Sequence, residues 1–188
     1  VDGHSIDRAI EVAKALRPEI RVLYQQGRGK GDALKYGIKH ASGDIIVTLD
    51  ADGATEPEQM SEFIEPLLNS YDFAKGSRFL NSHPNMPLHR RFGNWVLTTV
   101  ANLLFGTKYT DICSGYNAFW KKVINDINLF SNGFEMEQEM NVKIKKAGLK
   151  IIEVPCQDKG RISGSSKVSG LKQGLNNLKT IVVERFRG

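Results

Sequence analysis

The chain has 188 residues, 40% of them hydrophobic and 25% charged, a composition typical of one globular domain that buries a sizeable core. Its formal net charge of +5 favours an anionic partner such as a nucleotide, a phosphate-bearing substrate, nucleic acid or a phospholipid surface. The two cysteines, Cys113 and Cys156, have neither the spacing of a zinc site nor the number needed for a disulfide framework, and they are compatible with a reducing cytosol.

The ends of the sequence predict a fragment of a longer protein. The chain opens on Val1 and Asp2-Gly3, which is typical of the end of a strand whose beginning is missing. No signal peptide is visible, and no uninterrupted apolar stretch reaches the ~18 residues that a membrane span needs. We expect a single domain over residues 1–188 and no spanning segment within it.

The first half of the chain alternates predicted helices and strands. Ser5 is a typical N-cap residue, and apolar periodicity predicts helices over 6–16, 32–40 and 57–68. Apolar runs predict strands over 20–24, 45–49 and 72–76. Strands and helices in this order predict a parallel sheet with right-handed crossovers.

The second half continues with longer helices. Periodicity predicts helices over 89–105, 135–147 and 171–186, and strands over 116–120 and 149–154. Between the last strand and the last helix, residues 157–169 are rich in charge, glycine and serine and are expected to form a loop. The predicted fold class is α/β, with a mostly parallel central sheet flanked by helices.

The most informative stretch is the apolar run 45–49, which ends in two carboxylates, Asp50 and Asp52. In an open α/β sheet, ligands bind at the carboxyl ends of the strands. Two neighbouring acids repel each other unless a cation lies between them, and oxygen ligands suit Mg²⁺ or Mn²⁺, which commonly also bind substrate phosphates. The alternative is that these residues form an Asx turn or cap the next helix.

Eight short motifs, in order along nearly the whole chain, resemble those of family 2 glycosyltransferases of the GT-A fold. They lie at 1–7, 29–34, 50–52, 76–79, 111–116, 133–140, 153–155 and 161–167. The last motif, with its Arg, Gly and Ser-Lys, is similar to the branch of dolichyl-phosphate mannosyltransferases and bacterial polyprenyl-phosphate glucosyltransferases. The resemblance implies a GT-A sheet whose N-terminal strand is missing here, and an inverting hexosyltransferase.

The resemblance also implies how a nucleotide-sugar donor would be bound. Asp2 would accept hydrogen bonds from the base or ribose, and Lys30, between two glycines, would approach the nucleotide closely. Asp52, and less directly Asp50, would hold a Mg²⁺ or Mn²⁺ ion that bridges the diphosphate. The alternatives are that Asp2 caps the following helix together with Ser5 and that Lys30 is a solvated turn residue.

Basic residues from separate segments would bind the acceptor. If the acceptor is a polyprenyl or dolichyl phosphate, its oxygen is already an anion, so it needs cations that position it rather than a strong base. The resemblance implies that role for Arg78, a candidate catalytic residue with Asp52, and for Arg90, Arg91, Arg161, Ser166 and Lys167. A solvated or phospholipid-facing position is the alternative for Arg90 and Arg91.

Glu139 is the third candidate catalytic residue. In family 2 enzymes with hydroxyl acceptors, an acid near this place serves as the general base. Glu135, Glu137 and Glu139 lie at the start of a predicted helix, where acids also complement the helix dipole and face water. A family 2 transferase with a soluble or saccharide acceptor, with Glu139 as its base, is therefore an alternative.

The chain departs from the family pattern at two places. Gly3 and His4 replace the second Asp and the Gly of the first motif, and Gly53-Ala54 follows Asp52 where the mannosyltransferase branch has a Leu-Gln pair whose Gln can assist the metal. Metal affinity or donor preference is therefore expected to differ. A catalytically silent domain that binds nucleotide sugars is a further alternative.

Together these observations predict a transferase that moves a hexose from a donor of the UDP-glucose or GDP-mannose type to a lipid phosphate. We expect it in the cytoplasm at the cytosolic face of a membrane. The helix over 89–105, with Arg90 and Arg91 before an apolar stretch, suits a membrane surface, although a buried core helix is the alternative. No aromatic and basic residues interleave as in nucleic-acid-binding proteins, so nucleic acid is not an expected partner.

Overall fold

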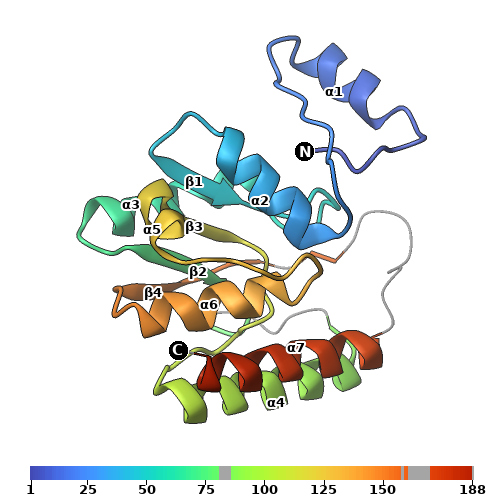
Figure 1. The fold of residues 1–188 in the computed structure, drawn as a ribbon. Helices are drawn as coiled ribbons and strands as arrows, with labels where there is room; N and C mark the ends of the chain where they lie inside the picture. Colours follow the sequence, from blue (N-terminus) through green and yellow to red (C-terminus); the bar gives the residue numbers. More distant parts are fainter. Residues whose placement is uncertain (81–85, 158, 161–169, 188) are drawn as a thin grey trace.

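Four strands form one mixed sheet at the centre of the structure, a computed structural model that describes residues 1–80, 86–157, 159–160 and 170–187 (Figure 1). The strands are β1 (Ile45–Thr48), β2 (Phe73–Ser77), β3 (Asn117–Trp120) and β4 (Ile151–Pro155). Their spatial order is β1-β3-β2-β4. β2 and β4 pair in parallel, whereas β3 is antiparallel to both β1 and β2.

The predicted α/β class is confirmed, but the first two strands are not neighbours. β1 and β2 run in the same direction, as the helix between them predicts, and β3 lies between them. Ala118 and Phe119 on β3 are fully buried on opposite faces of the sheet, which is the property of a central strand. The alternation of elements predicts the direction of a strand but not which strand lies beside it.

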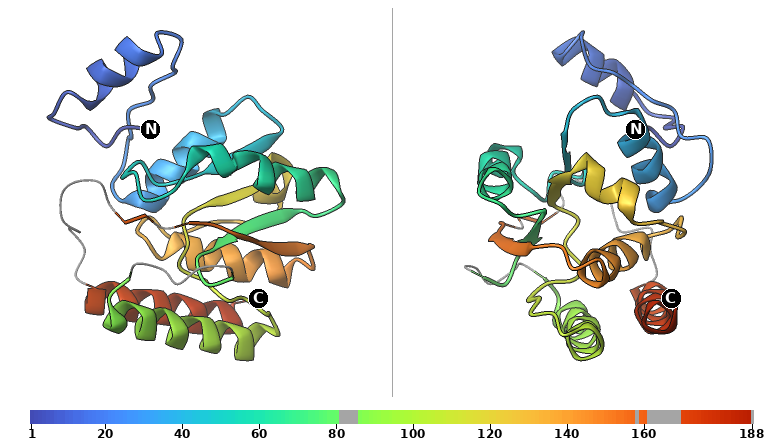
Figure 2. Two further views of the ribbon diagram at one scale, coloured as in Figure 1. Left: turned by 180° about the vertical axis from the view of Figure 1, so that it is seen from behind. Right: turned by 60° about the vertical axis from the view of Figure 1, so that its left-hand side comes forward.

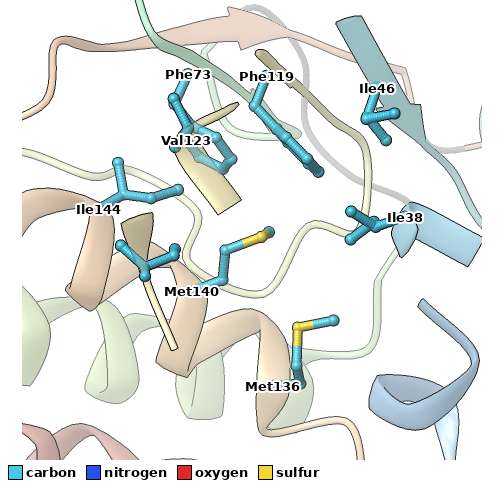
Figure 3. Packing of buried hydrophobic residues seen from close by; sticks show 9 residues of the cluster. Ile38, Ile46, Phe73, Phe119, Val123, Met136, Met140 and Ile144 are labelled. Atoms are coloured by element: carbon cyan, nitrogen blue, oxygen red, sulfur yellow. The ribbon is translucent and has the colours of Figure 1, made fainter. Parts of the chain in front are cut away.

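Helices cover both faces of the sheet. On one face, α2 (Lys30–His40), α5 (Lys121–Asp126) and α6 (Met136–Lys146) pack on β1, β2 and β3 around Phe73 and Phe119 (Figure 3). On the other face lies α3 (Met60–Leu68), which follows the 3-10 turn η1 (Pro57–Gln59). The ring of Phe63 on α3 stacks on Tyr116, with centroids 4.0 Å apart. A helix at 121–126 was not predicted from the sequence.

Two long helices form an outer layer beyond α6. α4 (Leu88–Phe105) and α7 (Gly170–Phe186) lie side by side in all three ribbon views (Figures 1 and 2). They join α6 through a third buried cluster that includes Leu97, Val142 and Ile181. Within the described parts of the chain, no helix is both long enough and apolar enough to cross a bilayer.

The N-terminal segment differs from the prediction. Helix α1 (Ala9–Leu16) begins three residues later than expected: its N-cap residue is Arg8, not Ser5, and the carboxylate of Asp7 accepts a hydrogen bond from the amide of Ala9. No residue of α1 is buried. The expected strand over 20–24 is reduced to a single bridge between Asp2 and Tyr24. The pattern predicts strand character, but a strand forms only where a partner strand lies beside it.

Candidate active site

Asp50 follows β1 at the edge of the sheet and forms an ion pair with Lys30, the first residue of α2. The Nζ atom of Lys30 lies 2.6 Å from Oδ1 of Asp50 and 2.8 Å from Oε1 of Glu137, in the first turn of α6. We name these three residues the Lys30 cluster. Burial alone would lower the pKa of Lys30, but the carboxylates of Glu137 and Asp50 outweigh it and raise that pKa above its usual range.

The local fold explains how three elements meet in the Lys30 cluster. At the start of α2, the amides of Gly31 and Asp32 donate hydrogen bonds to the carbonyl oxygens of Gly133 and Asn132, just before α6. This contact places the first turns of both helices together at the end of β1. Lys30 is therefore a mostly buried charge, and the alternative of a solvated turn lysine is wrong: its side chain is only 18% exposed.

Gly115 lies directly against the three charged side chains of the Lys30 cluster. A Cβ atom at this position would lie 2.9 Å from Oε1 of Glu137, 3.0 Å from Oδ2 of Asp50 and 3.0 Å from Nζ of Lys30. A side chain at this position therefore requires the ends of these charged side chains to shift. The residue belongs to segment 111–116, a name we keep for the six residues that precede β3.

At its other end, segment 111–116 forms a second cluster of charge. Asp111 is fully buried and accepts hydrogen bonds from Nε of Arg78 (2.7 Å), Nη2 of Arg78 (3.0 Å) and the side-chain amide of Asn94 (2.7 Å). We name these three residues the Asp111 cluster. Burial would raise the pKa of Asp111, but the Arg78 guanidinium outweighs it and holds that pKa below its usual range.

Glu153 on β4 fixes the start of the same segment. Its carboxylate accepts hydrogen bonds from the amide and hydroxyl of Thr110 and from the amide of Asp111. The position of Arg78 is thus set by a chain of contacts that begins in β4. The planar guanidinium uses one edge on Asp111 and is only partly exposed, with 16% of its side chain accessible.

Asp52 lies two residues beyond Asp50, and its Oδ1 atom accepts a hydrogen bond from the amide of Ala54 at 3.1 Å. Among the described residues, no three or more His, Cys, Asp or Glu side chains are grouped to hold a metal ion. Asp50 and Asp52 still fit Mg²⁺ or Mn²⁺, because such ions are commonly held by one or two carboxylates and complete their shell with phosphate oxygens and water. The side chain of Asp50 is 46% exposed and accessible for that role.

Glu139 does not join either cluster. Its carboxylate is fully buried and accepts hydrogen bonds from the amides of Phe130 and Ser131 and from Nζ of Lys143. Burial would raise its pKa, but these donors outweigh it and lower that pKa. Through these hydrogen bonds, Glu139 fixes the backbone at residues 130–131. Glu137, two residues earlier, is the acid of α6 that lies beside Asp50.

The remaining predicted residues are not members of the two clusters, and three of them lie outside the described residues. The carboxylate of Asp2 accepts hydrogen bonds from the amide and hydroxyl of Ser5. Where the family pattern has Gly, His4 has a φ of 64°, in the left-handed region that favours glycine. On α4, Arg90 is exposed and Arg91 half-buried. Arg161, Ser166 and Lys167 lie outside the described residues.

Comparisons with known proteins show the family of this chain. Residues 1–127 match the family described as Glycosyl transferase family 2. The chain is 36% identical over 146 residues to a UDP-N-acetylglucosamine–dolichyl-phosphate N-acetylglucosaminyltransferase of Methanococcus voltae, covering 73% of this chain and 58% of that one. It is 33% identical over 178 residues to a dolichol-phosphate mannosyltransferase of Pyrococcus furiosus, covering 90% of this chain and 50% of that one. The chain thus spans only about half the length of these relatives.

The fold resembles that of a solved glycosyltransferase. The crystal structure of glucosyl-3-phosphoglycerate synthase from Mycobacterium tuberculosis, in complex with Mn²⁺, UDP and glucosyl-3-phosphoglycerate, superposes with a TM-score of 0.73 and 18% identity. The match covers 98% of this chain and 67% of that one. This likeness confirms the predicted GT-A fold.

The close approach at Gly115 predicts that Gly115→Ala forces the Lys30 cluster apart. We expect a loss of about 1 kcal/mol in the free energy of unfolding, at the low end for overpacked sites because only side-chain ends must shift, measured by urea denaturation. Gly174→Ala on α7 is the matched control, because nothing lies within 4 Å of a Cβ atom there. That control is expected to be neutral or to gain up to about 1 kcal/mol. Equal effects of the two substitutions would contradict the assignment.

The buried pair of Asp111 and Arg78 predicts a pH-dependent stability. The folded-state pKa of Asp111 is depressed, so its carboxylate stabilises the protein above the unfolded pKa of about 3.9 and stops doing so as pH falls through the folded value. Asp111→Asn should therefore cost about 3 kcal/mol at pH 7 and less below pH of about 4. Urea denaturation across that pH range measures this loss in the free energy of unfolding, with Asp126→Asn, at an exposed position, as the control. A difference between wild type and Asp111→Asn that does not change with pH would refute the expectation.

Proposed function

Because the chain belongs to glycosyl transferase family 2, we propose that it transfers a hexose from a nucleoside-diphosphate sugar to a polyprenyl or dolichyl phosphate. The observation that carries this proposal is that two charged clusters meet the two ends of segment 111–116. Asp50 and Lys30 lie at one end, and Arg78 lies at the other. Two relatives whose names state a dolichyl-phosphate acceptor support the acceptor class. Their names state different sugars, so the proposal leaves the donor open between UDP and GDP sugars.

On the donor side, the leaving diphosphate needs positive charge near the end of β1. Lys30 supplies a fixed ammonium there, and Asp50 and Asp52 would hold Mg²⁺ or Mn²⁺, which supplies further charge to stabilise the leaving diphosphate when bound. Asp2 would contact the base or ribose, with its carboxylate already oriented by Ser5.

On the acceptor side, the nucleophile is an oxygen of the lipid phosphate. It forms a bond to the anomeric carbon as the bond from that carbon to the diphosphate oxygen breaks, with inversion at the carbon. Arg78, held by Asp111, would position the attacking phosphate, together with Arg90, Arg91, Arg161, Ser166 and Lys167. This chemistry needs no general base, which fits a site in which Glu139 is buried and bonded to three donors. The alternative with Glu139 as base for a hydroxyl acceptor has no support from this geometry.

An exposed apolar face suits the membrane in which such an acceptor lies. On α4, Leu88, Phe92, Trp95 and Leu103 fall on one side of the helix, and each is at least 63% exposed. On the neighbouring α7, exposed apolar residues again fall on one side: Leu171, Leu175, Val182 and Phe186. Apolar stripes on adjacent helices are typical of a surface that inserts into a lipid interface. We name these eight residues the α4–α7 apolar face and propose that it rests on the cytosolic leaflet.

The transfer reaction is tested with labelled UDP-glucose, UDP-N-acetylglucosamine and GDP-mannose, a polyprenyl phosphate and Mn²⁺. We expect lipid-linked sugar from one donor, loss of product with EDTA, and a fall in kcat of about 10²-fold or more in Asp52→Ala. Asp126→Ala, an exposed acid at the end of α5, should retain full activity. Binding of a donor without turnover would favour the alternative of a catalytically silent domain. Transfer that EDTA does not diminish would refute the proposed metal requirement.

Binding to vesicles tests the membrane proposal. Replacing Phe92 and Trp95 by Ser removes large apolar side chains worth roughly 1.5–3 kcal/mol each, so the partition onto vesicles with anionic phospholipid should fall at least tenfold in a sedimentation assay. The matched control is Leu68→Ser on α3, because Leu68 is also exposed but lies away from the α4–α7 apolar face. Equal partition of both variants would contradict the proposed surface.

A further inference from the structure

A lysine is buried in the middle of the sheet, outside both charged clusters. Lys75 lies on β2 with 0% exposure, opposite Asn117 on β3 and beside Glu153 on β4. Its two predecessors, Phe73 and Ala74, are ordinary core residues of that strand. Burial of an ammonium in such a place is costly unless it is paired and hydrogen-bonded, so its presence calls for a compensating contact.

That contact is made to the backbone of segment 111–116. The Nζ atom of Lys75 donates a hydrogen bond to the carbonyl oxygen of Ser114 at 2.9 Å. Ser114 directly precedes Gly115, which closes the Lys30 cluster, and lies three residues after Asp111, which holds Arg78. Lys75 therefore binds segment 111–116 between the end that contacts the Lys30 cluster and the end that forms the Asp111 cluster.

Carboxylates of both charged clusters act electrostatically on Lys75. Burial lowers the pKa of Lys75, and the carboxylates of Asp111 and Glu137 offset only part of that effect. These two acids belong to different clusters, and each has its own cation, Arg78 or Lys30. The contact that holds the segment is therefore the hydrogen bond from Lys75 to Ser114, and an acid of each cluster partly offsets the cost of burying the lysine.

We propose that Lys75 is a positioning residue that couples the donor and acceptor halves of the site by holding segment 111–116 in place. It touches neither substrate. Release of Ser114 would let Gly115 move from the Lys30 cluster and Asp111 move with Arg78, so both halves would loosen together. The catalytic part of this inference rests on the proposed transferase function, whereas the hold on the segment does not.

The test compares Lys75→Met with Phe73→Leu in the same protein. Methionine keeps the length of the side chain but removes the charge and the donor, whereas Phe73→Leu disturbs the core from the same strand and leaves Ser114 untouched. Lys75→Met should raise the KM values for the donor and for the lipid phosphate together, each at least fivefold. Phe73→Leu should lower the melting temperature without moving either KM.

Hydrogen exchange separates the structural claim from the enzymatic one. In Lys75→Met, amides of segment 111–116 should exchange at least tenfold faster under conditions where the protein stays folded, while those of α3 keep their rates. Lys75→Gln, which keeps an N–H donor on a side chain one bond shorter, should show a smaller increase, and it replaces Lys75→Met if that variant does not fold. If the wild type transfers no sugar but the exchange changes as stated, the proposed function fails and the positioning role stands. Unchanged exchange in the segment, or equal KM changes in Phe73→Leu, would overturn the inference.

Discussion

The arrangement of this site depends on the pairing of charges that are largely removed from water. Lys30 is the clearest case, because its ammonium sits between Asp50 at the end of β1 and Glu137 in α6. Removal of Lys30 would leave the buried carboxylate of Glu137 without its cation, which costs several kcal/mol. The start of α2, the end of β1 and the start of α6 are therefore held in one geometry. Gly115 completes that geometry because a Cβ atom there would lie 2.9–3.0 Å from all three charged side chains.

The same principle extends across the sheet to the second cluster. Asp111 is as deeply buried as Glu137 and is satisfied by Arg78 and Asn94. Segment 111–116 carries contacts to both clusters, and Lys75 supports it from within the sheet. For a transferase, this arrangement has a direct use: one segment sets the distance between the groups that face the leaving diphosphate and those that face the attacking phosphate. The α4–α7 apolar face would then present that site to an acceptor dissolved in a bilayer.

The sequence predicts the parts of this structure that depend on local patterns. The apolar run before Asp50, the periodicity of α3 and α4 and the order of motifs were sufficient to predict the α/β class and the GT-A fold. They could not predict that β3 inserts between β1 and β2, since strand order depends on packing between distant segments. In the N-terminal segment a local pattern predicts too much: residues 20–24 have the pattern of a strand but make only one bridge to a partner.

Among the site residues, motif and spacing identify Lys30, Asp50 and Arg78 as candidates but do not say what each one contacts. Glu137 and Glu139 are two residues apart on a polar helix, and nothing in the sequence distinguishes the acid beside Lys30 from the acid that fastens residues 130–131. α6 is mostly buried despite its polar composition, so the usual rule that charge marks the solvent face does not apply to it. Lys75 is equally hidden, because its role depends on the carbonyl of Ser114, 39 residues away.

The central claim is that the Lys30 cluster forms the donor site. Isothermal titration of wild type and Lys30→Met with UDP and GDP sugars in the presence of Mn²⁺ measures this binding, with Lys39→Met, an exposed lysine of α2, as the matched control. We expect one nucleotide sugar to bind to the wild type and to the control, and Lys30→Met to weaken this binding by about tenfold or more. Equal affinity of a folded Lys30→Met variant would contradict the account and would place the donor elsewhere.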